Sequence, residues 1–135
     1  MHRDLKCANV LVNSEGQVKL SDFGSSSKLQ AISVSDDSSS GETKNNPNSG
    51  IRGSPFWMAP EVVKGESTGK PQDVWSLGCC LIEMLTGQPP WIKYGTDAAT
   101  IMEVIKNTRR APSYPQNIEA MCKDFLKYCF IIDAT

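Results

Sequence analysis

The order of apolar and polar residues along the chain predicts a short hairpin near the N-terminus. Residues 10–12 (VLV) and 17–20 (QVKL) are two short runs typical of strands. The four residues between them, NSEG, are turn formers. We therefore expect two antiparallel strands in the first 20 residues of the sequence.

Three later segments have apolar residues at helical spacing. Residues 73–86 are apolar almost all round, which predicts a helix buried inside a core, and Gly87 should end it. We expect a second helix over residues 97–107, capped by Asp97 or Thr96, and a third over about 118–130. The residues expected on the inner sides of these last two helices are Ile101, Met102, Val104, Ile105, Ile118, Met121, Cys122, Phe125, Leu126 and Cys129.

Residues 25–50 differ in composition from the rest of the chain. Ser, Asn, Asp and Gly dominate, and there are few apolar anchors to offset the entropy of ordering. We expect a long flexible loop there. Taken together, the patterns predict an α+β fold, mainly α, in a single domain over residues 1–135, with a small β-hairpin and this loop as an insert.

Composition and charge exclude several classes of protein. A formal net charge of -1 gives no basic surface for nucleic acid or an anionic membrane. The longest apolar run, residues 74–85, is interrupted by Ser76 and Glu83 and is too short to span a bilayer. The five cysteines include no Cys-x-x-Cys pair, and with His2 as the one histidine we expect reduced, buried thiols instead of a zinc site.

Three motifs in order carry the candidate chemistry. Residues 2–9 read HRDLKCAN, residues 22–24 read DFG after the predicted hairpin, and residues 59–61 read APE. Each motif alone is short, but their order and spacing together resemble the catalytic half of the eukaryotic protein kinases. The resemblance implies a kinase C-terminal lobe that begins at the catalytic loop and reaches a late helix, with residues 25–50 in the activation loop.

Phosphoryl transfer requires a protein mainly to position groups and to neutralise charge. By resemblance, Asp4 orients the substrate hydroxyl and accepts its proton, and Lys6 neutralises charge on the transferring phosphate of ATP. Asn9 and Asp22 would hold Mg²⁺, which prefers oxygen ligands. Leu11 would lie beneath the adenine. In isolation such an Asp or Asn is more often a turn former or a cap.

Other residues of the motifs have regulatory or structural roles by the same resemblance. Arg3 would pair with a phosphate on the activation loop and order it, although a surface ion pair is the plainer alternative. Asp73 would anchor the catalytic loop through backbone hydrogen bonds, and Ser54 would hydrogen-bond Asp4 and Lys6. The remaining positions implied are His2 and Phe23 in an apolar column, Gly24, Glu61, and the candidate phosphosites Thr43 and Ser49.

The substrate class follows from Lys6 and from residues 53–61, GSPFWMAPE, which resemble the Ser/Thr-specific pattern. A finer resemblance, to the MAP kinase kinase kinases of the STE group, rests on residues 53–63, 73–79 and 83–91. It implies a cytoplasmic Ser/Thr kinase that uses ATP and Mg²⁺, with a MAP kinase kinase as protein substrate. No nucleic-acid partner or membrane span is expected, and the oligomeric state stays open.

The sequence departs from the family pattern at both ends. The Gly-rich loop, the strand lysine and its helix glutamate do not precede Met1, so we expect a truncated sequence that binds ATP weakly and is inactive alone. The arginine that would pair with Glu61 does not follow Thr135. A non-catalytic, pseudokinase-like interaction module is the alternative, whereas a P-loop hydrolase is excluded because no GxxxxGK loop occurs.

Overall fold

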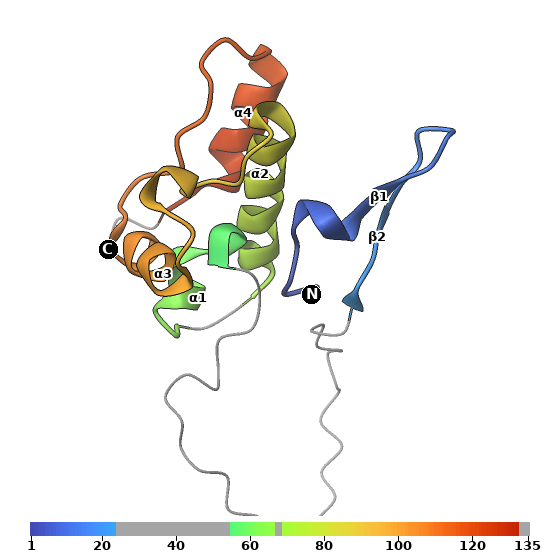
Figure 1. The fold of residues 1–135 in the computed structure, drawn as a ribbon. Coiled ribbons are helices and arrows are strands. Elements are labelled where there is room, and N and C mark those ends of the chain that lie inside the picture. The colour runs from blue at the N-terminus through green and yellow to red at the C-terminus, as the bar shows by residue number, and fades with distance from the viewer. Residues whose placement is uncertain (24–54, 67–68, 133–135) are drawn as a thin grey trace, which may run out of the picture.

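A long helix, α2 (Lys70–Thr86), runs through the helical part of the molecule (Figure 1). The structure is a computed structural model that describes residues 1–23, 55–66 and 69–132. The helix begins three residues before the predicted start, because Pro71 fits the first turn, where a missing N–H costs no hydrogen bond. It ends as predicted: Gly87 adopts a left-handed φ of 75°, and its N–H donates to the Glu83 carbonyl at 2.7 Å.

The prediction that α2 is buried all round is wrong. Trp75, Cys79 and Ile82 are at most 2% exposed, but Val74 is 45% and Met84 57% exposed. The partners that pack on α2 among the described residues cover only part of its circumference. The apolar composition therefore revealed how hydrophobic this helix is, and not how many neighbours it has.

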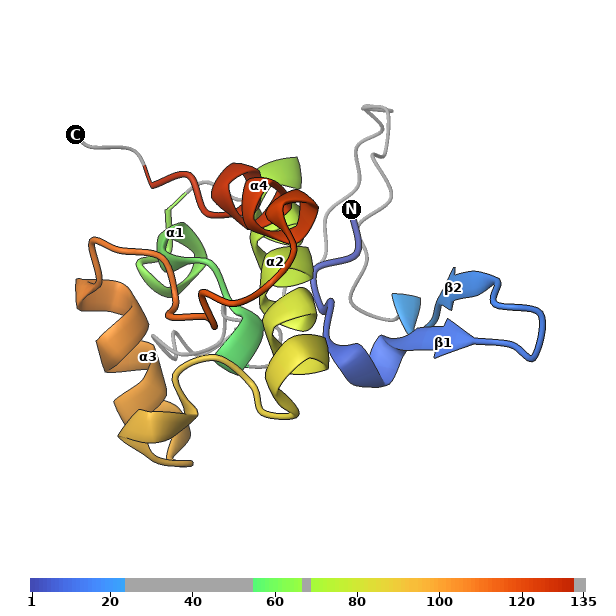
Figure 2. The same cartoon turned by 90° about the horizontal axis from the view of Figure 1, so that it is seen from above.

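The helix α4 (Ala120–Cys129) lies against α2 (Figures 1 and 2). Together with Ala59 and Phe130, the two helices form a first core cluster, whose buried members are Ala59, Trp75, Cys79, Ile82, Leu126, Cys129 and Phe130. A Cβ added at Gly78 of α2 would lie 2.6 Å from Cys129 Cβ, so the two helices approach closely only because residue 78 is glycine. Trp75 packs edge-on against the Phe130 ring with 4.9 Å between centroids. This contact fixes the C-terminal end of α4 on the first half of α2.

The helical spacing located α4 correctly but made its buried face too wide. Leu126 is fully buried and Cys129 is 6% exposed, as predicted. Met121 and Phe125, also expected inside, are 80% and 40% exposed. A narrow stripe suffices here because α4 has one packed side, against α2.

A second core cluster joins α1 (Pro60–Val63) to α3 (Ala98–Asn107). Its centre is formed by Ile101 and Ile105, both with 0% exposure, as the helical spacing predicted. Asp97 caps α3 as expected, because its Oδ2 accepts the Thr100 N–H at 3.0 Å. The short 3₁₀ segments η3 (Pro55–Trp57), which precedes α1, and η4 (Ile92–Tyr94), which lies between α2 and α3, both contact α3.

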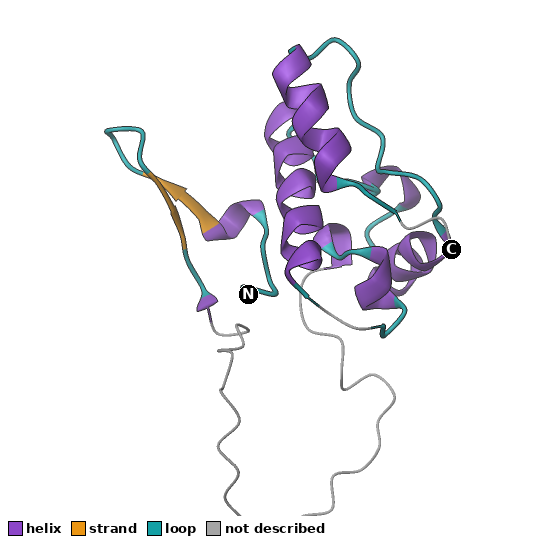
Figure 3. Ribbon diagram, turned by 180° about the vertical axis from the view of Figure 1, so that it is seen from behind, coloured by secondary structure: helices purple, strands orange, loops and turns teal. Residues whose placement is uncertain are grey.

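The predicted hairpin is present as β1 (Val10–Val12) and β2 (Val18–Leu20), preceded by the 3₁₀ turn η1 (Cys7–Asn9). The strands are antiparallel, with Val10 opposite Leu20 and Val12 opposite Val18. The hairpin extends away from the helices, while η1 lies beside α2 (Figures 2 and 3). Its turn is held by Asn13, whose Oδ1 accepts the backbone N–H groups of Glu15 and Gln17.

Helices dominate the described residues and the strands form a single two-stranded sheet, so the predicted α+β, mainly α, class is confirmed. The expected flexible loop over residues 25–50 lies outside the described residues. Within the described part of the chain, no helix is long and apolar enough to cross a bilayer.

Candidate active site

The loop that carries Asp4 is bound to the first turn of α2 by Asp73. The Asp73 carboxylate accepts the backbone N–H of His2 at 2.7 Å and that of Arg3 at 2.9 Å. These are the backbone hydrogen bonds expected of Asp73. Arg3 has a φ of 70°, which an L-residue seldom adopts, and the second bond holds it there. The two bonds thus fix the direction of the chain as it enters Asp4.

His2 joins this loop to the far end of the hairpin. Its ring is buried, at 5% exposure, and Nδ1 accepts the Asp4 N–H at 3.2 Å. Because Nδ1 is an acceptor, Nε2 carries the proton and donates to the Ser21 carbonyl, 2.7 Å away. The Phe23 ring lies 4.8 Å from the His2 ring at an angle of 57°. His2 therefore couples residues 2–4 to residues 21–23.

Asn9 closes the loop from the other side. It is 5% exposed, and its Nδ2 donates to the Asp4 carbonyl at 2.8 Å. Its own carbonyl accepts the Ser21 N–H at 2.8 Å. Because the amide nitrogen donates its hydrogen bond to the Asp4 carbonyl, the amide oxygen points away from Asp4 and can accept from, or coordinate, a further partner.

Asp4 and Lys6 form an ion pair within the loop. Lys6 Nζ lies 3.9 Å from Asp4 Oδ2, and the two side chains are 29% and 16% exposed respectively. Both groups therefore reach solvent from a partly buried position. A carboxylate and an ammonium at this separation can orient a hydroxyl and offset negative charge on a group that approaches them.

The two remaining candidate ligand positions lie along the hairpin. Asp22 is exposed and has a left-handed φ of 58°, which Asp tolerates better than most residues. One residue before it, Ser21 is bonded to Asn9 through its N–H. The amide oxygen of Asn9 and the Asp22 carboxylate are oxygen donors, the type that Mg²⁺ prefers, so the residues present fit this ion. Leu11 on β1 is 52% exposed, and its apolar side chain is open to an apolar ligand.

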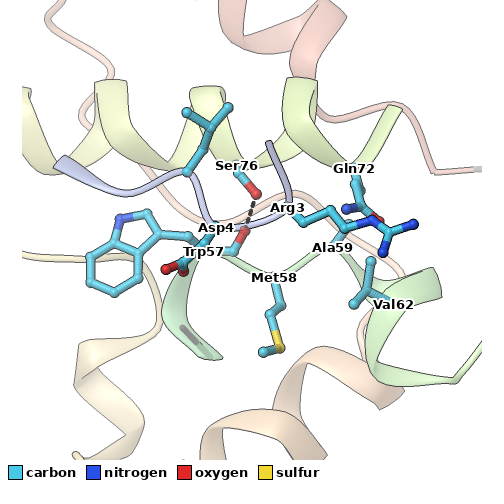
Figure 4. Close-up of a pocket in the computed structure, with 9 residues that line it drawn as sticks. Arg3, Asp4, Trp57, Met58, Ala59, Val62, Gln72 and Ser76 are labelled. Atoms are coloured by element: carbon cyan, nitrogen blue, oxygen red, sulfur yellow. Dashed lines mark hydrogen bonds between the residues drawn. The ribbon is translucent and has the colours of Figure 1, made fainter. Parts of the chain in front are cut away.

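A small cavity lies beside the loop, between it and the start of α2 (Figure 4). Arg3 extends into the cavity toward Gln72 and Val62, and Asp4 lies at its other side. Met58 and Ala59, which follow η3, form another wall. The cavity thus brings together the loop of residues 2–6, the segment after η3 and the first turns of α2.

Sequence reasoning missed the hydrogen bonds that hold η3 on α2. Ser76 Oγ donates to the Trp57 carbonyl at 2.6 Å (Figure 4), and Trp57 Nε1 donates to Glu83 Oε2 at 3.0 Å. The signal was available, because Ser76 and Glu83 interrupt an otherwise apolar helix. Polar side chains in such a position generally have hydrogen-bond partners.

Glu61 is half-buried in the first turn of α1, where a carboxylate complements the helix dipole. Its carboxylate has no hydrogen bond or ion pair with a residue in the described ranges. Since the side chain stays partly exposed, leaving it unpaired costs less free energy than an unpaired carboxylate that is fully buried. Gly24, Thr43, Ser49 and Ser54 lie outside the described residues.

Of the thiols near the loop, Cys79 and Cys80 are buried and Cys7 is partly exposed. Cys7 Sγ donates to the Cys80 carbonyl at 3.3 Å, which ties η1 to α2. Burial raises the pKa of the Cys80 thiol to about 11 and also raises the pKa of Cys7 and of Cys79. All five cysteines are free thiols; Cys79, Cys80 and Cys129 are buried, and the other two are partly exposed.

The fold and the loop geometry are consistent with part of a protein kinase, and the comparison with known families agrees. Residues 1–135 match the protein kinase domain, so the chain belongs to the protein kinase family. The prediction from the HRD, DFG and APE motifs that the chain is part of a protein kinase is thereby confirmed.

Within the family, the chain is similar to MAP kinase kinase kinases. It is 43% identical over 134 residues to mitogen-activated protein kinase kinase kinase 3 of Mus musculus, which covers 97% of this chain and 19% of that protein. It is 42% identical over 130 residues to mitogen-activated protein kinase kinase kinase A of Dictyostelium discoideum, covering 96% and 12%. An Arabidopsis thaliana mitogen-activated protein kinase kinase kinase 3 is 37% identical over 129 residues, covering 96% and 18%. The chain therefore spans a fifth or less of these relatives' lengths, and the predicted resemblance is confirmed.

Proposed function

We propose that the protein containing this chain is a serine/threonine kinase that transfers the γ-phosphate of ATP to a protein, a MAP kinase kinase in a signalling cascade. The observation that carries the proposal is the fixed position of Asp4. Its N–H donates to the His2 ring and its carbonyl accepts from Asn9, while its carboxylate faces Lys6. Asp73 holds the two residues before it by accepting the N–H groups of His2 and Arg3. The match to MAP kinase kinase kinases supports the choice of substrate.

The residues act by position and charge. Asp4 orients the Ser or Thr hydroxyl of the substrate and accepts its proton as the oxygen attacks the γ-phosphorus. Lys6 offsets negative charge on the phosphate oxygens. Asn9 and Asp22 hold Mg²⁺, which when bound neutralises phosphate charge. Leu11 contacts the adenine. Ser54 completes the substrate side by hydrogen-bonding Asp4 and Lys6.

Regulation is proposed to act through Arg3. A guanidinium beside the catalytic Asp can pair with a phosphate on Thr43 or Ser49 and so fix the substrate side of the site. Arg3 lies at the cavity with its Nε–H buried and unbonded, which supports a role for this side chain in binding. Phe23 and Gly24 connect the Mg²⁺ ligand Asp22 to the segment that carries Thr43 and Ser49. Glu61 stabilises the part of the chain that follows this segment.

We further propose that the protein works in the cytoplasm and that residues 1–135 alone are inactive, because the phosphate loop and the strand lysine of a kinase are outside them. The test is transfer of labelled phosphate from ATP to a purified MAP kinase kinase by the full-length protein, followed by phosphoamino-acid analysis. Phosphoserine and phosphothreonine are the expected products.

Two variants sharpen this test. Asp22→Asn should raise the Mg²⁺ concentration needed for half-maximal activity, because one charged oxygen ligand is lost. Asp124→Asn, at an exposed position on α4, is the matched control and should behave like wild type. Phosphotyrosine as the main product would refute the substrate class, and no transfer by the wild-type protein would favour a non-catalytic interaction module.

A further inference from the structure

The first turn of α2 contacts the Asp4 loop through two consecutive residues. Asp73 binds the backbone N–H groups of His2 and Arg3. The residue before it, Gln72, is 6% exposed and lines the cavity into which Arg3 extends (Figure 4). The helix therefore presents one side chain to the backbone of Arg3 and the adjacent one to its side chain.

Two polar atoms at this cavity are buried without a hydrogen-bond partner. They are Nε of Arg3, a donor, and Oε1 of Gln72, an acceptor. Buried polar groups in native proteins are nearly always paired, because leaving one unpaired costs free energy comparable to a lost hydrogen bond. Arg3 and Gln72 offer complementary atoms, and their side chains lie near each other in Figure 4. The two atoms are not bonded to each other in the structure, so pairing them requires a change in the outer side-chain torsions.

We propose that Gln72 is a positioning residue for Arg3. Its Oε1 accepts the Nε–H and so fixes the plane of the guanidinium, with the four Nη–H donors directed to an anion. The inference rests on the proposed function, in which Arg3 binds a phosphate. Less side-chain entropy is lost on binding when the donors are already oriented.

A neutral carboxamide suits this task better than its alternatives. A glutamate at position 72 would neutralise the Arg3 charge that attracts the anion. An apolar side chain of the same length would fill the space and leave the guanidinium free to turn. Gln72→Met therefore separates positioning from packing, because Met keeps the length and loses the acceptor. Gln72→Asn, which keeps the carboxamide but draws it back by one methylene, is the second variant.

The experiment measures binding of inorganic phosphate to the dephosphorylated full-length protein. The midpoint of thermal unfolding is followed against phosphate concentration at constant ionic strength, with chloride as the balancing anion. Arg3→Met defines the part of the response that depends on Arg3. The double variant Arg3→Met/Gln72→Met completes a double-mutant cycle.

Gln72→Met should weaken the Arg3-dependent phosphate affinity by about 5- to 10-fold, the size of one ordinary hydrogen bond, with little change in unfolding midpoint without phosphate. Gln72→Asn should weaken it similarly, and Gln72→Met should have no effect once Arg3 is Met. Wild-type phosphate affinity in the Gln72→Met and Gln72→Asn variants, or additive effects in the cycle, would overturn the inference. If Arg3→Met itself leaves phosphate binding unchanged, the inference also fails, whereas the kinase proposal is judged separately by phosphate transfer.

Discussion

Replacing Asp73 by Ala tests how the Asp4 loop is held. The substitution removes the acceptor of two backbone N–H groups, those of His2 and Arg3, and leaves both donors without it. A hydrogen bond to a charged group contributes about 1.5–3 kcal/mol. Because Asp73 is only half-buried and solvent can replace part of the loss, we expect the loop to be destabilised by about 2–4 kcal/mol.

Amide hydrogen exchange measured by mass spectrometry reports this loss locally. A loop destabilised by that amount should exchange the amides of residues 2–9 about 30- to 1,000-fold faster, while the interior of α4 keeps its wild-type rate. In the full-length protein, kcat for phosphate transfer should fall about 100-fold, because Asp4 loses its fixed position.

The control is Asp124→Ala, which removes a carboxylate that is 71% exposed and lies 3.9 Å from Lys127. It should change neither exchange at residues 2–9 nor kcat, because exposed ion pairs contribute little. Wild-type exchange over residues 2–9 in the Asp73→Ala variant would show that contacts other than those of Asp73 hold the Asp4 loop.

Three further predictions concern the helices. Gly78→Ala should lower the free energy of unfolding by about 1–3 kcal/mol in denaturant titrations, because its Cβ would lie 2.6 Å from that of Cys129, whereas Val74→Ala on the exposed side of α2 should cost less. Asp97→Ala should lower the melting temperature at pH 7, because it removes the cap of α3. Hydrogen bonds from Thr100 lower the pKa of Asp97 in the folded protein. The stabilisation by Asp97 is therefore fully present above its unfolded pKa and is lost as the pH falls through its folded pKa. Iodoacetamide at pH 8 should spare Cys80 in the folded protein, because burial raises the pKa of its thiol to about 11, and should label it after denaturation; labelling at equal rates in both states, read by mass spectrometry, would contradict its burial.

Periodicity and turn chemistry predicted the hairpin and the three longer helices, because those signals are local, but not the short helix α1 or the 3₁₀ segments. Gly87 was identified as a helix end, and Asp97 as one of two candidate caps with Thr96, from residue type alone; both have the expected geometry. Burial was predicted less well: Val74 and Met121 are exposed because exposure depends on which neighbours a helix has, and a sequence pattern does not contain that number.

The candidate site was predictable where a motif assigns roles and not where a contact is specific to this chain. Asp73 was expected to bind the loop backbone, and it does. The pairing of Ser76 with the Trp57 carbonyl and the place of Gln72 beside Arg3 were not foreseen. Both contacts depend on how η3 and the Asp4 loop pack on α2. These segments lie far apart in the sequence, so a local pattern does not predict their packing.

The most direct test of Asp4 as the catalytic base is the kinetics of Asp4→Asn in the full-length protein. Asparagine keeps the size of the side chain and the backbone contacts to His2 and Asn9, but it cannot accept the substrate proton. A general base contributes about 10²- to 10⁴-fold, so kcat should fall by at least about 100-fold while the Kd for ATP changes less than about threefold. A variant that keeps kcat within about threefold of wild type would contradict the assignment of Asp4 as the catalytic base.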